Sequence, residues 1–293
     1  MEYIVENNNI LVNDYLDFDI EHILECGQCF RFYKKSDKDY LLIAYDKILR
    51  VTQGDNKIIF HNTNTNDFDT IWTNYFDLGR DYGDIKKVLS DIDEHLHKAV
   101  SEKGGIRILQ QDTWETLISF IISQNKNITH IKILIEELSK KYGTYIGEED
   151  NVKYYSFPTI EQLSAASEQD LRDLKVGFRA PYIVDACRKV FNNEVDLVGL
   201  ASMKIEEAKN ELMKIKGVGP KVADCVLLFG AKRYEVFPTD VWVKRIMEHY
   251  YFNKDTKIKA IHEFAVEQYG TLAGFAQQFL FYYARDFKIG KKW

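Results

Sequence analysis

The stretch "KIKGVGPKVADCVLLFGAKRYEVFPTDVW" at residues 214–242 decides the fold. Its turn consists of Gly217, Val218 and Gly219, and glycines allow positive φ and a close approach of a partner to the backbone. Pro220 suits the first position of the apolar helix that follows. The free amides and positive dipole end of such a helix attract anions. Because the spacing does not fit a P-loop, it predicts a helix-hairpin-helix that holds a nucleic-acid phosphate; a plain helix-turn-helix corner is the alternative.

Lys221 and Asp240 are the two residues of this stretch whose side chains can take part in a reaction. Lys221 falls in the first turn of the second helix, where the dipole and apolar surroundings favour the neutral amine. A neutral lysine is a nucleophile that can form a Schiff base. Asp240 ends "FPTD" and can cap the next helix. It also lies beside Lys221 if the two helix starts converge.

Composition indicates a globular protein that contacts its partner through one basic region. The chain has 293 residues, of which 45% are hydrophobic, and a net charge of −6. Residues 204–293 nevertheless hold 16 Lys and Arg against 11 Asp and Glu, so the opening stretch lies in a basic region suited to a polyanion. No apolar run of membrane-spanning length and no secretory leader pattern is present, so no membrane contact is expected.

The pattern of the chain changes near residue 110. Before it, "CFRFY", "YLLIAY", "ILRVTQ" and "KIIFHN" are short, aromatic and β-branched, with turn residues between them. After it, helical periodicity begins with Asp112 as an N-cap, and Thr159 and Ser167 look like the caps of further helices. We therefore predict an α+β fold, with an N-terminal antiparallel β domain over residues 1–110 packed on an all-helical domain over residues 111–293.

The central motif is similar to that of a known family. Gly-Val-Gly-x-Lys followed by an apolar helix and Pro-x-Asp resembles the HhH-GPD superfamily of DNA glycosylases. The resemblance implies that Lys221 marks a glycosylase that also cleaves the strand at the abasic site. It implies that Asp240 is the second catalytic residue. The sequence departs from the pattern in one place, since no glycine precedes Pro238.

Three further stretches, spanning Gly27 to Phe281, resemble the 8-oxoguanine DNA glycosylase/AP lyase family: "CGQCFR", "SQNKNITHI" and "GFAQQFLF". Branches of the superfamily with an iron–sulfur cluster carry four cysteines after the catalytic region. No cysteine follows Cys225, so we expect no iron–sulfur cluster, no metal and no other cofactor. The Cys26-Gly-Gln-Cys29 pair has no second cysteine pair, and we interpret it as two small residues around a turn.

The resemblance implies a pocket for a flipped base. The Gly27 carbonyl would sense the proton on N7 of 8-oxoguanine. Phe281 would stack on the base and Cys225 would form the opposite wall. Gln277, four residues before Phe281 and hence on the same helix face, would bond the pairing edge of the base.

The resemblance also implies a set of DNA contacts. Asn125 would fill the gap left by the flipped nucleotide. Arg179 would read the opposite cytosine, and His130 stands where the family has a second arginine. A neutral His offers one donor where Arg offers a fork, so the preference for cytosine is expected to be relaxed. The predicted DNA-binding residues are Asn125, Asn127, His130, Phe178, Arg179, Gly217, Val218, Gly219 and Trp242.

The sequence thus predicts a bifunctional DNA repair glycosylase that excises 8-oxoguanine and then cleaves the strand by β-elimination. The expected partner is double-stranded DNA containing 8-oxoguanine, with the protein acting as a monomer in the cytoplasm of a prokaryote or in a nucleus. Two alternatives remain. One is a DNA-binding module that uses the hairpin but makes no demand on Lys221 or Asp240. The other is a helix-hairpin-helix glycosylase for another damaged base.

Overall fold

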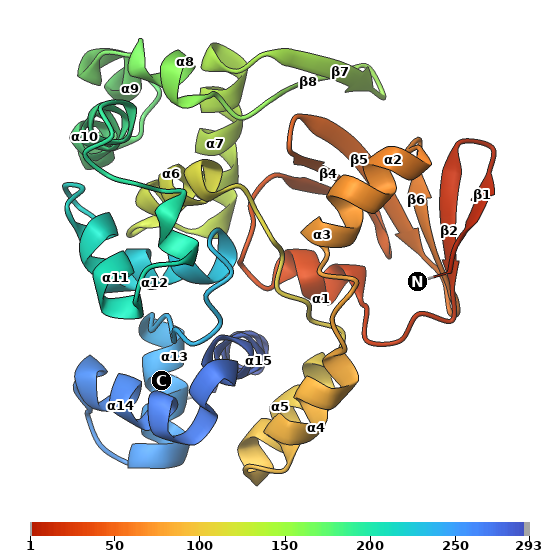
Figure 1. The fold of residues 1–293 in the computed structure, drawn as a ribbon, viewed down its shortest axis with the longest axis vertical. Helices are drawn as coiled ribbons and strands as arrows, with labels where there is room; N and C mark the ends of the chain where they lie inside the picture. The colour runs from red at the N-terminus through yellow and green to blue at the C-terminus, as the bar shows by residue number, and fades with distance from the viewer. Residues whose placement is uncertain (1, 290–293) are drawn as a thin grey trace.

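The computed structural model describes residues 2–289, which form a β domain beside a larger, mostly helical part (Figure 1). Residues 290–293 of the predicted helical domain lie outside the described residues. None of the described helices is both long and apolar enough to cross a membrane.

The N-terminal domain is built on one six-stranded antiparallel sheet with the strand order β1-β2-β6-β5-β4-β3, which confirms the predicted antiparallel arrangement. Its strands are β1 (Ile4–Glu6), β2 (Asn9–Asn13), β3 (Phe32–Ser36), β4 (Asp39–Ala44), β5 (Lys47–Gln53) and β6 (Lys57–His61). One face packs on α1 (Ile20–Glu25) around Leu42, Val51 and Phe60, which are all buried. The sheet therefore supplies a rigid support for the loop that follows α1.

The stretch from residue 65 to residue 103 is mostly helical, so the predicted antiparallel β domain over residues 1–110 is not built from strands alone. It contains α2 (Thr65–Asp67), the π-helix η1 (Phe68–Trp72), α3 (Thr73–Tyr75), α4 (Tyr82–Ser90) and α5 (Glu94–Lys103). Side chains of Asn64, Asp81 and Asp93 cap α2, α4 and α5 by accepting backbone N–H bonds. These caps favour helix starts locally, although the segments are rich in aromatic residues.

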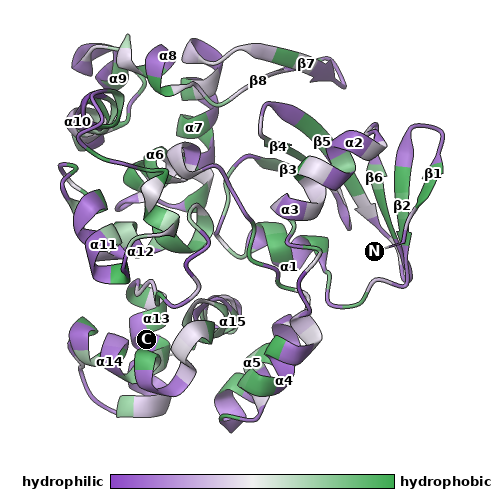
Figure 2. Cartoon of the chain, in the orientation of Figure 1, coloured by the Kyte–Doolittle hydropathy of each residue, from purple (hydrophilic) through white to green (hydrophobic). Residues whose placement is uncertain are grey.

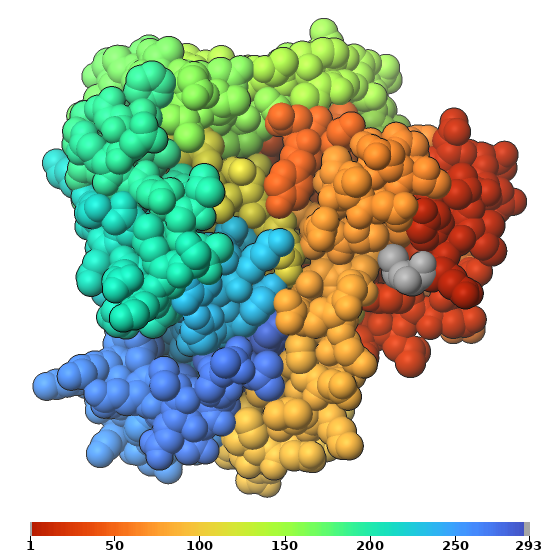
Figure 3. Space-filling model, viewed as in Figure 1, coloured from red at the N-terminus to blue at the C-terminus, as the bar shows by residue number. Residues whose placement is uncertain are grey.

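Helices α4 and α5 pack with the C-terminal part of the chain. Leu89, Leu96 and Val100 belong to the same buried cluster as the helical domain. Figure 2 shows that α5 carries both hydrophobic and hydrophilic residues, as expected for a helix with one buried face. In the space-filling view the α4–α5 segment lies against the C-terminal helices (Figure 3). The two parts of the molecule are thus joined by a shared core.

In the part of the chain from residue 113 to residue 289, the ordered elements are helices apart from one hairpin. Its α-helices are α6 (Thr113–Ser123), α7 (Ile128–Tyr142), α8 (Ile160–Ser164), α9 (Glu168–Asp173), α10 (Ala180–Phe191), α11 (Ile205–Met213), α12 (Pro220–Phe229), α13 (Val241–Met247), α14 (Ile258–Tyr269) and α15 (Ala273–Asp286). Single turns are η2 (Gly177–Arg179), η3 (Gly199–Ala201), η4 (Glu248–Phe252) and η5 (Gly270–Leu272). The hairpin of β7 (Tyr145–Glu149) and β8 (Val152–Tyr155) corrects the expectation of an all-helical domain.

The predicted caps are confirmed. Asp112 accepts the Glu115 amide at the start of α6. Thr159 and Ser167 each form a reciprocal capping box at the start of α8 and α9. Helix α6 packs against α12, and the Phe120 and Phe229 rings stack between them with centroids 5.6 Å apart. These two buried helices, α6 and α12, support the cavity that is described below.

Candidate active site

The hairpin between α11 and α12 has the predicted shape, but its two glycines serve different purposes. Gly217 has φ +80°, and a Cβ there would lie 2.2 Å from the Tyr182 ring, so only glycine fits. Gly219 has φ −102° and ψ −179°, an extended conformation that any residue adopts. The expectation of a positive φ is therefore wrong for Gly219. No atom lies within 4 Å of a Cβ built on Gly219, so this position is open toward a partner.

The turn presents unpaired backbone amides. Val218 donates its amide to the Ile215 carbonyl at 3.1 Å, and Lys216 donates to Asp185 Oδ2 at 2.7 Å. Within residues 2–289, no acceptor takes a hydrogen bond from the Gly217 or Gly219 amide. Free N–H groups at the positive end of a ten-residue helix are suited to a phosphate oxygen.

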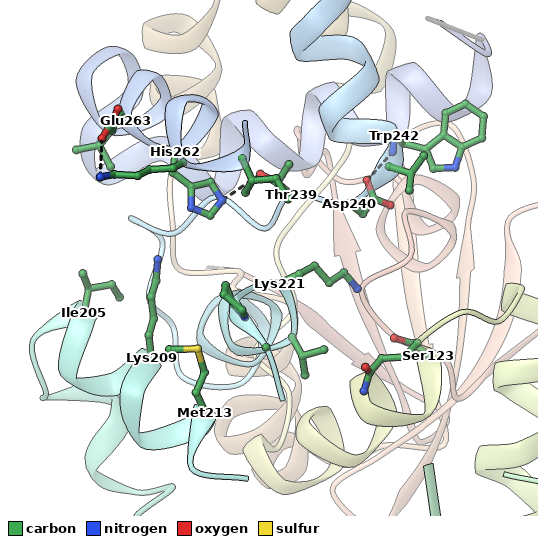
Figure 4. Close-up of a pocket in the computed structure, with 18 of the residues that line it drawn as sticks. Ser123, Ile205, Lys209, Met213, Lys221, Thr239, Asp240, Trp242, His262 and Glu263 are labelled. Atoms are coloured by element: carbon green, nitrogen blue, oxygen red, sulfur yellow. Dashed lines mark hydrogen bonds and ion pairs between the residues drawn. The ribbon is translucent and has the colours of Figure 1, made fainter. Parts of the chain in front are cut away.

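Lys221 lies one residue after Pro220 in the first turn of α12. Its side chain is half-buried, and Nζ lies 5.1 Å from the centroid of the Phe120 ring. Figure 4 shows the Lys221 side chain reaching from α12 into a cavity, with Asp240 on the facing wall. The amine thus sits in a partly apolar place that a substrate can still reach.

Asp240 caps α13 and faces the same cavity. Its Oδ1 accepts the Trp242 amide at 2.9 Å and the Val243 amide at 2.8 Å. Burial raises the pKa of the Asp240 carboxyl above its usual value, and these two amides and the charge of Lys221 oppose that rise. The two helix starts converge in the structure, because Lys221 and Asp240 line one cavity together.

A narrow slot, with a volume of about 50 Å³, lies beside Lys221. It is lined by Gly27, Phe120, Lys221, Cys225, Phe229, Pro238, Asp240, Gln277, Gln278 and Phe281. All four predicted base-pocket residues and both predicted catalytic residues belong to this set. The volume holds only a few water molecules, so side chains must move apart to admit a base.

The loop around Gly27 is held rigidly over the slot. Gly27 has φ +81°, and a Cβ there would lie 3.3 Å from the Phe281 ring. The side chain of Gln28 is fully buried and bonds the carbonyls of Ile23 and Arg107 and the Leu109 amide. Within the described chain nothing donates to the Gly27 carbonyl, so this acceptor is available to a ligand in the slot.

Cys225 forms an apolar wall of the slot. It lies one helical turn after Lys221 and is 3% exposed. Burial raises the pKa of its thiol to about 11, so the group stays protonated at neutral pH. A neutral thiol packs like a small hydrophobic side chain, which suits a surface against a flat base.

A wide groove of about 1580 Å³ opens onto the slot. Lys221 and Asp240 line both cavities. The predicted DNA-binding residues among its lining are Asn125, Asn127, Gly219 and Trp242. The start of α12, the α6–α7 loop and the start of α13 therefore all line this groove.

The α6–α7 loop projects its polar residues. Asn125 is exposed and has φ +52°, which asparagine tolerates better than most residues. Asn127 caps α7 by accepting the His130 amide at 2.9 Å. His130 itself is exposed in the first turn of α7, near the loop but outside the lining of both cavities.

Arg179 is placed differently from the expectation that its fork is free. The side chain is 2% exposed, with Nη1 donating to the Val176 carbonyl at 3.1 Å and Nη2 to the Gln124 carbonyl. Gln124 immediately precedes Asn125, so Arg179 anchors the α6–α7 loop instead of presenting a fork to DNA. Its guanidinium lies 4.3 Å from the Phe178 ring, which is 48% exposed.

Several residues of the site escaped the sequence reasoning. Phe120, Phe229 and Gln278 also line the slot. The two phenylalanines lie in apolar stretches that read as core positions, and nothing in the local sequence singles out Gln278. Arg285 holds the Gly27 loop by donating Nη2 to the Glu25 carbonyl, while its guanidinium lies 5.5 Å from the Phe281 ring. Only its place four residues after Phe281, on the same helix face, could have drawn attention to it.

Comparison with known proteins agrees with this geometry. Residues 10–117 match the N-terminal domain of 8-oxoguanine DNA glycosylase, and residues 118–269 match the HhH-GPD superfamily of base excision DNA repair proteins. Over 233 residues the chain is 33% identical to a probable N-glycosylase/DNA lyase of Methanothermobacter thermautotrophicus, covering 72% of each protein. Over 158 residues it is 44% identical to the N-glycosylase/DNA lyase of Saccharomyces cerevisiae, covering 50% of this chain and 42% of the yeast protein.

A solved structure is similar over nearly the whole chain. It is the 8-oxoguanine glycosylase/lyase of Clostridium acetobutylicum in complex with double-stranded DNA containing cytosine opposite 8-oxoguanine. The TM-score is 0.95 at 41% identity, with 99% of both chains covered. The chain therefore belongs to the HhH-GPD superfamily of base excision DNA repair proteins and carries the N-terminal domain of the 8-oxoguanine DNA glycosylases.

Proposed function

We propose that this chain is a bifunctional DNA glycosylase that excises 8-oxoguanine from duplex DNA and then cleaves the strand, with Lys221 as the nucleophile. The observation that carries the assignment is that Lys221 and Asp240 line both the wide groove and the narrow slot. If the groove holds the DNA backbone and the slot holds the flipped base, the sugar that joins them lies at Lys221. A module that only binds DNA has no use for this arrangement.

The reaction begins when a nucleotide flips out of the duplex, because its sugar cannot be attacked inside the stack. The Lys221 amine forms a bond to C1′ while the bond from C1′ to the base breaks, and the base leaves with the electron pair and takes up a proton. The Asp240 carboxylate stabilises the positive charge that develops on the sugar. Opening of the sugar ring gives a Schiff base between Lys221 and C1′.

Strand cleavage follows from the Schiff base. The iminium nitrogen withdraws electrons, so a base can remove a proton from C2′ and the 3′ phosphate leaves by β-elimination. Water then hydrolyses the Schiff base and releases Lys221 as the free amine. The Lys221 amine supplies the covalent chemistry and the Asp240 carboxylate the electrostatic support, and the proposal includes no metal or other cofactor.

The slot supplies the selectivity. Phe281 and Cys225 would hold the flipped base between them, and Gln277 would bond its pairing edge. The Gly27 carbonyl would accept a hydrogen bond from the N7–H group that 8-oxoguanine has and guanine lacks. Support for this comes from the slot lining, the free Gly27 carbonyl and the neutral Cys225 thiol.

The duplex would lie across the groove, with one protein molecule bound at each lesion. The protein would act in the cytoplasm or in a nucleus. The amides of Gly217 and Gly219 would hold a phosphate without reading sequence. Asn125, at the exposed tip of the α6–α7 loop, would enter the gap that the flipped nucleotide leaves.

Excision assays on single-lesion duplexes test the function. The protein should release 8-oxoguanine opposite cytosine and cut the strand without added alkali. Duplexes with 3-methyladenine or with an oxidised pyrimidine should react far more slowly. Base release that leaves the strand intact until alkali is added would show a monofunctional enzyme, and a faster reaction on either other lesion would move the assignment to that branch.

Gly27→Ala should weaken the discrimination of 8-oxoguanine from guanine by roughly tenfold, the worth of one hydrogen bond. The φ of +81° strains any other residue, and the added Cβ meets Phe281 at 3.3 Å, so the loop shifts and its carbonyl moves. The measurement is single-turnover excision of both bases opposite cytosine. An unchanged ratio would show that the Gly27 carbonyl does not read N7. Gly54→Ala, in an open turn of the sheet, is the control.

His130→Arg should steepen the preference for cytosine over adenine opposite the lesion. The exposed start of α7 leaves room for a longer side chain, and a fork on cytosine adds about 1–3 kcal/mol of discrimination. The check is single-turnover excision of 8-oxoguanine opposite each of the four bases. Thr129→Arg adds the same charge at the neighbouring exposed position. An equal gain in both variants would mean that only charge matters and that His130 lies away from the opposite base.

A further inference from the structure

Gln278 is a buried amide in the wall of the slot with one atom that lacks a partner. The residue is 2% exposed. Its Nε2 donates to Gln277 Oε1 at 2.8 Å, whereas its Oε1 is buried and accepts no hydrogen bond. Buried acceptors are nearly always paired, because an unpaired one destabilises the fold. An apolar side chain in this position would avoid that cost, so the orphan oxygen calls for a ligand that donates to it.

The contact between the two amides fixes their orientation. Because Gln277 Oε1 accepts from Gln278, the Gln277 amide cannot turn over without losing this bond. Gln277 Nε2 then remains as a donor, and no described residue accepts from it. The linked amides therefore offer a ligand one donor, Gln277 Nε2, and two acceptors, Gln277 Oε1 and Gln278 Oε1.

This set of one donor and two acceptors is complementary to the pairing edge of a guanine-type base. That edge presents the O6 acceptor, the N1–H donor and the 2-amino donor in sequence, which is the pattern that cytosine reads in a base pair. One glutamine amide has one donor end and one acceptor end, enough for O6 and N1–H. The 2-amino group needs a second acceptor, and Gln278 Oε1 is the unpartnered acceptor in the slot wall.

We propose that Gln278 is a specificity-determining residue whose Oε1 accepts a hydrogen bond from the 2-amino group of the flipped purine, while its Nε2 holds the Gln277 amide in its reading orientation. This inference rests on the proposed excision of 8-oxoguanine. It adds a second point of recognition to the Gly27 carbonyl: Gly27 senses oxidation at the N7 side, and Gln278 senses that the base derives from guanine.

Removal of the 2-amino group from the substrate tests the proposal. The two substrates are duplexes with 8-oxoguanine or 8-oxohypoxanthine opposite cytosine, which differ only in that group. The parent protein should excise 8-oxoguanine faster by about tenfold or more, because a site built to hold a donor discriminates against the analogue that lacks it. Equal rates on both substrates in the parent would overturn the proposal.

Gln278→Met then assigns the effect to this residue, since methionine has a similar length and no acceptor of comparable strength. The variant should lose most of the preference by slowing more on 8-oxoguanine than on 8-oxohypoxanthine, because both substrates lose the support that Gln278 gives to Gln277 but only 8-oxoguanine loses the bond to its 2-amino group. Equal slowing on both substrates would mean that Gln278 only supports the wall. Gln278→Ala serves as a second variant, and Gln268→Met, exposed on α14, is the matched control.

The outcome separates this inference from the proposed function. A parent protein that releases no 8-oxoguanine contradicts the function itself. A parent that releases it but ignores the 2-amino group contradicts only the role of Gln278.

Discussion

Lys221→Gln is expected to lose base excision by roughly four orders of magnitude or more, the size of effect seen when an enzyme loses its nucleophile. Glutamine keeps most of the length of the side chain but has no amine that can attack C1′. DNA binding should persist, because the hairpin amides and the other residues of the groove are unchanged. Single-turnover excision and a binding titration on the same 8-oxoguanine duplex measure the two properties separately.

Lys98→Gln provides the control for the loss of one positive charge, since Lys98 is exposed on α5 and away from both cavities. This variant should keep the parent rate. If Lys221→Gln retained a rate within tenfold of the parent, another group would have to be the nucleophile. If it lost binding and excision together, Lys221 would be part of the DNA contact instead.

Asp240→Asn is expected to slow excision by about 10²- to 10³-fold while changing stability little. The carboxylate supports the charge that develops on the sugar, and removal of one such electrostatic contact has an effect of this size. Asparagine caps a helix about as well as aspartate, so α13 should keep its bonds to the Trp242 and Val243 amides. Thermal unfolding and single-turnover rates distinguish the two roles.

Asp240→Ala completes the comparison because it removes the cap as well as the charge, at about 1 kcal/mol of stability. Burial raises the pKa of Asp240, so the carboxylate is lost as pH falls through a value above the usual range for aspartate, and excision should decline there. An Asp240→Asn variant with the parent rate would leave Asp240 as a helix cap alone.

The parts of the site that the sequence predicted correctly are those fixed by local spacing. Gly217 to Lys221 is a short motif whose geometry follows from a turn and a helix start. Gln277 and Phe281 share a face because they are one turn apart. The start of α13 is marked by Asp240, whose side chain caps it.

The features that escaped prediction depend on tertiary packing. Arginine is a residue type typical of DNA contacts, but the Arg179 guanidinium donates hydrogen bonds to the carbonyls of Val176 and Gln124 and is buried. Gln278 lies on a helix that is buried nearly all round, so its sequence neighbours do not show which side faces a cavity. The helices after residue 64 contain aromatic and β-branched residues that fit strands equally well, and their packing on the helical core decides the outcome.

Borohydride trapping on a duplex with one 8-oxoguanine opposite cytosine tests the central claim most directly. Borohydride reduces a Schiff base to a stable amine, so the parent protein should become covalently joined to the cleaved strand. After proteolysis, the sugar remnant should be found on the peptide that contains Lys221. Base release without any covalent adduct, or an adduct on another lysine of the groove such as Lys126 or Lys209, would contradict the assignment of Lys221 as the nucleophile.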